Sequence, residues 1–156
     1  SIGISDLREV LSEETIVKEL VSSSYDNSNL SMTFENPTAI EAGKPYLIKV
    51  TEDIVNPTFK NVVVRNISTT VNTTYVNFVP AIGKTLVIGA EGAEDNIQSV
   101  LFLGATNKFI HPTVVNQPDN EDSYLKGFRA YFQLHDGAFM ARSFSSNIDG
   151  ELTGII

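Results

Sequence analysis

Short runs in which apolar and polar residues alternate, separated by turn residues, occur along most of this chain. The clearest run covers residues 127–134, where the even-numbered residues are apolar and Arg129, Tyr131 and Gln133 stand between them. A period of two is typical of a strand with one face on a core and the other on solvent. We therefore expect the even-numbered side chains to point inward and the three polar ones outward.

Nine or ten short strands are predicted in this way. The candidates lie at residues 15–24, 30–35, 46–51, 59–65, 71–79, 84–88, 99–103, 108–111, 127–134 and 139–144. Hairpin turns are expected at 25–29, at 104–107 and at the Asp136-Gly137 dipeptide, and Pro80 is expected to end its strand. Val, Ile, Thr, Phe and Tyr, the residues that favour strands, supply more than a third of the chain.

One stretch near the start has helical spacing instead. Ile4, Leu7, Val10 and Leu11 recur on one face, and Ser5 is expected to cap the helix. The fold class is therefore all-β: an antiparallel β-sandwich of Greek-key or jelly-roll type with one short N-terminal helix. We expect residues 1–156 to form a single domain, a fragment of a longer protein.

Composition excludes several classes of function. The chain has no Cys, which excludes disulfides, thiolate nucleophiles, Cys-ligated zinc and iron–sulfur clusters. Its net charge of −8 opposes binding to a phosphate backbone, so nucleic acid is not an expected partner. No apolar run reaches the roughly 18 residues of a transmembrane segment, and none is predicted.

Sequence motifs for catalysis are also missing. No Gly-x-Ser-x-Gly elbow occurs, and the serines at 22–24 are expected on an exposed strand surface. His111 ends a strand and His135 stands beside a turn, where a solvated imidazole is the ordinary outcome. Gly83-Lys84-Thr85 imitates the end of a phosphate-binding loop without the preceding glycine. We predict that the protein is not an enzyme and has no required cofactor.

Acidic and aromatic residues remain as binding candidates. Asp119, Glu121 and Asp122 place three carboxylates within four residues of a loop, and these oxygens could ligate calcium. The usual alternating calcium-loop pattern is absent, so a solubilising loop is the competing interpretation. Sugar-binding faces use exposed aromatic rings beside polar groups, and the candidates for a glycan site are four tyrosines: Tyr25, Tyr75, Tyr124 and Tyr131.

Several longer stretches, taken together and in this order, suggest a family. They are residues 40–50 (IEAGKPYLIKV), 56–62 (NPTFKNV), 75–79 (YVNFV), 99–105 (SVLFLGA), 125–134 (LKGFRAYFQL) and 141–144 (ARSF). In these stretches the chain resembles a β-rich domain found near the C-termini of exported cell-surface proteins of Bacteroidetes, often following leucine-rich repeats. The resemblance implies an extracellular or outer-membrane location and neighbouring domains of the same polypeptide as partners. It implies no established activity.

The sequence therefore leads to three hypotheses. The first is a non-catalytic accessory or adhesion-type module of a bacterial cell-surface or secreted protein, with a glycan or a host protein as a further partner. The alternative is a carbohydrate-binding module, assisted by calcium. A glycoside hydrolase is the least favoured, because no reacting pair of carboxylates can be identified.

Overall fold

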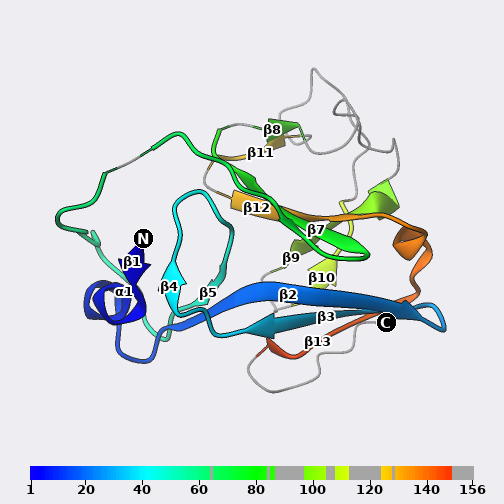
Figure 1. Cartoon of the computed structure of the whole chain (residues 1–156), viewed down its shortest axis with the longest axis horizontal. Helices are drawn as coiled ribbons and strands as arrows, with labels where there is room; N and C mark the ends of the chain where they lie inside the picture. Colours follow the sequence, from blue (N-terminus) through cyan, green and yellow to red (C-terminus); the bar gives the residue numbers. More distant parts are fainter. Residues whose placement is uncertain are drawn as a thin grey trace.

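The computed structural model describes residues 1–63, 65–83, 85–86, 97–104, 108–112, 124–127 and 129–148. For Thr85, Leu86, Ile97 and Tyr124 this description covers the backbone alone. The described part is mostly β, with one α-helix and several sheets (Figure 1). None of its helices is long and apolar enough to cross a membrane.

A four-stranded sheet contains the first predicted hairpin. Its strands, in spatial order, are β13 (Ser143–Ser146), β3 (Asn29–Glu35), β2 (Ile16–Asp26) and β5 (Leu47–Lys49). Asn27 and Ser28 turn the chain between β2 and β3 with φ of 49° and 64°, so the hairpin prediction is confirmed. The all-antiparallel prediction is wrong for one pair, because β13 runs parallel to β3.

A five-stranded antiparallel sheet makes the second large unit. Its strands, in spatial order, are β10 (Phe109–Ile110), β9 (Val100–Leu103), β12 (Arg129–Leu134), β7 (Val76–Ala81) and β6 (Val71–Asn72). The β9–β10 hairpin was predicted from the sequence and is confirmed. Pro80 does not end its strand as predicted but lies inside β7. It lies beyond the residues that β6 pairs with, Asn77 and Phe78, where β7 needs no donor on that side.

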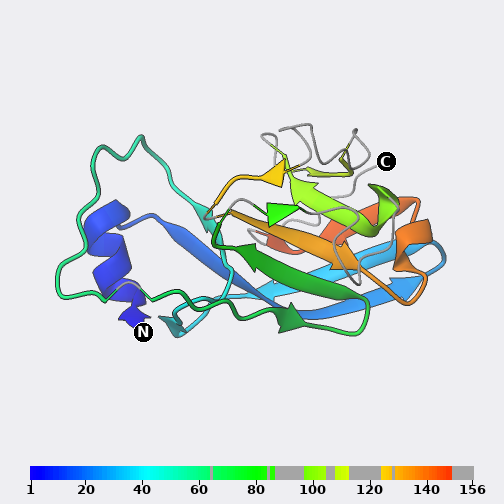
Figure 2. The ribbon, with the colours of Figure 1, turned by 90° about the horizontal axis from the view of Figure 1, so that it is seen from above.

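Smaller elements complete the described chain. They are β1 (Ile2–Gly3) paired with β4 (Ala39–Ile40), β8 (Thr85–Leu86) paired with β11 (Tyr124–Leu125), and the 3-10 turns η1 (Ile97–Ser99) and η3 (Ala138–Met140). The predicted helix is α1 (Ile4–Leu11), which buries Leu7. Ser5 does not cap it, because Gly3 holds the cap position and no side chain bonds there. Figures 1 and 2 both place α1 at the opposite end of the molecule from the β2–β3 hairpin.

One hydrophobic core joins the two large sheets. The predicted inward residues Leu30, Met32 and Phe34 are at most 1% exposed and pack in the same cluster as Phe78 and Phe132. The Phe132 ring stacks on Phe78 at 4.3 Å between centroids and meets Phe34 edge-on at 6.2 Å. Edge-to-face and offset contacts of this kind add to the free energy gained by burying the rings. Phe132 therefore contacts side chains of both sheets.

Three predicted strands are different in the structure. The strand predicted at 71–79 is divided into β6 and β7 by a turn at residues 73–75. No strand occurs among the described residues between β5 and β6, where 59–65 was predicted to form one. Val55 and Val63 are 81% and 75% exposed there, so β-forming residues without a neighbouring strand stay irregular. After the Asp136-Gly137 turn the chain forms η3 before β13, so the predicted strand at 139–144 is shorter and begins later. It then joins the other sheet.

The connection from β4 to β5 is held by side chains. The Tyr46 hydroxyl accepts a hydrogen bond from the Glu41 backbone N–H at 3.0 Å. Lys44 forms an ion pair with Glu19 of β2, and this hydrogen bond raises the pKa of Lys44 above its usual value of 10.5. Gly43 turns the chain with φ of +80°, a conformation that glycine adopts without strain.

Candidate functional site

Two of the four candidate tyrosines lie together in the structure. Tyr25 is near the end of β2 and Tyr75 directly precedes β7, and their ring centroids are 6.0 Å apart with the planes at 62°. Both rings are partly buried and pack against the core. Within the described part of the chain, neither phenol hydroxyl has a hydrogen-bond partner. The Tyr25–Tyr75 pair therefore combines a fixed aromatic surface with two hydroxyls that remain able to bond.

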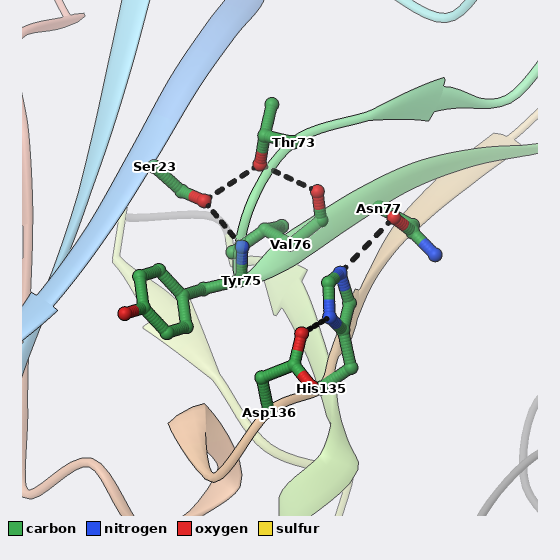
Figure 3. Close-up of polar contacts among 7 residues, drawn as sticks. All are labelled: Ser23, Thr73, Tyr75, Val76, Asn77, His135 and Asp136. Atoms are coloured by element: carbon green, nitrogen blue, oxygen red, sulfur yellow. Dashed lines mark hydrogen bonds and ion pairs between the residues drawn. The ribbon is translucent and has the colours of Figure 1, made fainter.

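A chain of hydrogen bonds holds the turn that carries Tyr75 (Figure 3). The Tyr75 backbone N–H donates to Ser23 Oγ at 2.9 Å, and Thr73 Oγ1 donates to the Val76 carbonyl at 2.6 Å. Ser23 Oγ and Thr73 Oγ1 are 2.6 Å apart. Because the only Thr73 hydroxyl proton is used by the carbonyl, Ser23 must donate to Thr73. The turn of residues 73–75 is thereby tied to β2.

His135, which directly follows β12, also binds the turn of residues 73–75. Its backbone N–H donates to the Tyr75 carbonyl at 3.1 Å. Its ring Nδ1 lies 2.8 Å from Asp136 Oδ2, and Nε2 lies 3.2 Å from Asn77 Oδ1 (Figure 3). A catalytic His–Asp pair would direct Nε2 at a nucleophile. Here Nε2 faces an amide, so the arrangement positions the side chain and the turn.

The other two tyrosine candidates lie elsewhere. Tyr131 was predicted to point outward, but it is 8% exposed in a second apolar cluster with Val100, against which Val79 and Phe102 pack. Burial disfavours the phenolate and raises the pKa of Tyr131 above 10.0. The outward face of β12 is therefore covered at this point, which the alternation alone could not reveal. Tyr124 lies in β11 opposite Leu86, and its side chain is outside the described part.

The predicted calcium ligands Asp119, Glu121 and Asp122 lie outside the described residues. Among the residues that are described, no three His, Cys, Asp or Glu side chains gather closely enough to hold a metal ion. His111 directly follows β10, with Nδ1 2.8 Å from the Val100 carbonyl oxygen and its ring centroid 5.4 Å from that of Phe144.

Sequence reasoning missed the polar residues that support the tyrosine pair. Ser22 and Ser24 are exposed as expected of a strand surface, but Ser23 is partly buried and bonded. The period of two does place Ser23 and Tyr25 on one face of β2, which is a usable signal. Nothing local indicates that Thr73 meets them, because their contact spans 50 residues.

Comparisons with known proteins add no relative to this picture. No protein-family model, no curated protein and no solved structure matches the chain.

Proposed function

We propose that the chain is a non-catalytic accessory module of adhesion type in an exported bacterial surface protein. The supporting observation is that side chains of the types used in catalysis form structural hydrogen bonds here. The hydroxyl protons of Ser23 and Thr73 are donated within the turn of residues 73–75 and its contact with β2, and the His135 ring lies between Asp136 and Asn77. The resemblance to surface proteins of Bacteroidetes supports an extracellular or outer-membrane location, with neighbouring domains of the same polypeptide as partners.

The fold that goes with this proposal is a β-sandwich with Greek-key or jelly-roll connections. The shared core supports it, because apolar side chains of the four-stranded and the five-stranded sheets meet around Phe132. Two sheets packed face to face with one core between them define that architecture. The parallel β13–β3 pair is a local departure from the antiparallel rule.

Location and activity can be tested separately. An antibody against the purified chain, applied to intact cells of the source organism, should label the cell surface or detect the protein in the medium. Detection only after lysis would contradict the proposal. Purified protein should leave a panel of chromogenic glycosides and esters unhydrolysed over hours. Turnover that the His135→Gln variant loses, while His111→Gln keeps it, would overturn the non-catalytic assignment.

A second candidate function, carbohydrate binding, is favoured by the Tyr25–Tyr75 pair. Aromatic rings stack on the apolar faces of sugars, and phenol hydroxyls beside them form hydrogen bonds with the sugar hydroxyls. The Asp136 carboxylate is 71% exposed in the turn that follows β12 and offers an acceptor near His135. A glycan at this pair would therefore have stacking and hydrogen-bonding groups available to it; Figure 3 draws Tyr75 and Asp136.

The test of carbohydrate binding uses variants that preserve packing. A glycan array identifies a binder, and calorimetry then measures its affinity for wild type, Tyr25→Phe and Tyr75→Phe. Loss of one ligand hydrogen bond should weaken binding by about 3- to 10-fold per variant. Tyr131→Phe is the matched control, because it removes the same atom from a buried ring. Equal effects in all three variants would argue against this site.

Calcium assistance through Asp119, Glu121 and Asp122 is part of the second candidate. A bound ion raises the free energy of unfolding by mass action, so Tm should rise in millimolar calcium and fall back in EDTA. The triple variant Asp119→Asn, Glu121→Gln, Asp122→Asn should lose this response. If calcium left Tm unchanged, the calcium proposal would be contradicted, whereas the proposal of a glycan site at Tyr25 and Tyr75 would not be affected.

A further inference from the structure

Helix α1 lies at the opposite end of β2 from Tyr25 and the β2–β3 hairpin (Figures 1 and 2). A cavity of about 570 Å³ lies at this α1 end of β2. Its walls come from α1, from the start of β2 and from the connection between β3 and β4. The volume is within the range of small-molecule pockets, roughly 300–1,000 Å³. Its apolar lining residues are Ile4, Ile16, Val17 and Pro37, and its polar ones are Arg8, Lys18, Asn36 and Thr38.

The charge of this lining is opposite to that of the protein. The chain carries 19 acidic and 11 basic residues, yet the cavity is lined by two cations and by no carboxylate. The acids of the helix, Asp6 and Glu9, are not among the lining residues. Neither Arg8 nor Lys18 is ion-paired within the described part of the chain. Two uncompensated cations at one cavity favour an anion there.

Local structure explains how the two cations reach the same space. Ile4 and Arg8 are four residues apart in α1 and therefore share a face of the helix. Ile16 and Lys18 are two residues apart in β2 and share a face of the strand. Arg8 Nε donates to the Thr15 carbonyl at 3.2 Å, which orients the guanidinium and leaves its terminal nitrogens to bind. A planar guanidinium of this kind suits a carboxylate.

The rest of the lining limits the ligand further. Ile4, Ile16 and Pro37 offer aliphatic contacts, and no aromatic ring that would stack on a sugar lines the cavity. We propose that this cavity binds a small organic acid, with its carboxylate held by Arg8 and Lys18 and its aliphatic part against these three residues. This site is separate from the Tyr25–Tyr75 pair and does not depend on its function.

Three probes of equal chain length test the proposal on the full chain: hexanoate, hexanol and hexylammonium. Amide shifts in ¹H–¹⁵N spectra report binding at the cavity backbone, at residues 8, 16–18, 36 and 38. Hexanoate should shift these amides saturably, and the other two probes should bind about tenfold more weakly or not at all. If hexanol bound as tightly as hexanoate, the proposal that the two cations hold a carboxylate would be overturned. If equimolar inorganic phosphate displaced hexanoate, the proposal that the aliphatic chain contributes to binding would be overturned.

Charge-removing variants locate the site. Arg8→Gln and Lys18→Gln should each weaken hexanoate binding about 5- to 10-fold, by loss of a charge-assisted hydrogen bond. Lys60→Gln is the matched control, because Lys60 is exposed and does not line the cavity. Arg8 also donates a hydrogen bond to the Thr15 carbonyl, so Arg8→Gln could disturb the helix. In that case Lys18→Gln is the decisive variant. An affinity that Lys18→Gln lowers no more than Lys60→Gln does would overturn the proposal.

Discussion

Ser23 Oγ of β2 lies 2.6 Å from Thr73 Oγ1 of the turn between β6 and β7, so one hydroxyl pair bridges the two large sheets across 50 residues of sequence. The same serine accepts the Tyr75 backbone N–H. With these two hydrogen bonds Ser23 holds the turn of residues 73–75, which places the Tyr75 ring beside the Tyr25 ring.

Replacing this serine should lower stability. In Ser23→Ala the Tyr75 N–H loses its acceptor and Thr73 loses its donor, in a partly buried region. We expect the free energy of unfolding, measured by urea titration, to fall by about 1–3 kcal/mol. Ser24→Ala is the control, since Ser24 is exposed on the next position of β2, and it should stay within about 0.5 kcal/mol of wild type. Equal losses in both variants would contradict the bridge.

Phe132 should be among the costliest core positions, because its ring contacts Phe34, Phe78 and Phe109 from three other strands. Phe132→Ala should lower the free energy of unfolding by about 3–5 kcal/mol, and Phe132→Leu should lower it less. Phe59→Ala makes the same change outside this core and should cost clearly less. If Phe132→Ala does not fold, the comparison of Phe132→Leu with Phe59→Leu carries the test.

Gly43 should not tolerate a side chain. Its φ is +80°, and a Cβ there would lie 2.5 Å from the Ile67 backbone oxygen. Gly43→Ala should therefore lose at least about 1–2 kcal/mol from the left-handed backbone alone, before the clash is counted. At Gly83 a Cβ would meet no atom within 4 Å, so Gly83→Ala should leave Tm nearly unchanged. A Gly43→Ala protein as stable as wild type would contradict both the left-handed backbone at Gly43 and the close approach of Ile67.

Tyr131 should make stability fall at alkaline pH. Burial raises its folded-state pKa above 10.0, so the unfolded chain releases the phenol proton first. The contribution is complete below about pH 10 and is lost as pH rises through the folded pKa. The free energy of unfolding should therefore drop less between pH 8 and pH 10.5 in Tyr131→Phe than in wild type. Lys44, whose pKa is also raised, is present in both proteins and cancels in the difference. Absorbance at 295 nm should show one tyrosine that titrates late in wild type and is missing in the variant.

The local sequence pattern predicted the structure correctly where nearby residues determine it. The alternation in residues 30–35 predicted the buried face of β3, and the Asp- and Asn-rich segment after Ser24 predicted the β2–β3 hairpin. It was insufficient for the segment 59–63, whose valines favour strands but have no partner strand. A strand needs a neighbour for its backbone bonds, and propensity does not supply one.

The sequence by itself therefore determined that the chain is β-rich, that the β2–β3 and β9–β10 hairpins form, and which face of β3 is apolar and buried. Only the tertiary structure decided that β13 leaves its predicted hairpin to run parallel to β3, that Tyr131 is covered, and that Tyr25 meets Tyr75. These outcomes depend on contacts between residues far apart in the sequence, such as Ser23 with Thr73 and Ser31 with Ser145. Periodicity specifies which way a side chain points from its own strand, whereas what it meets there is set by how the whole core packs.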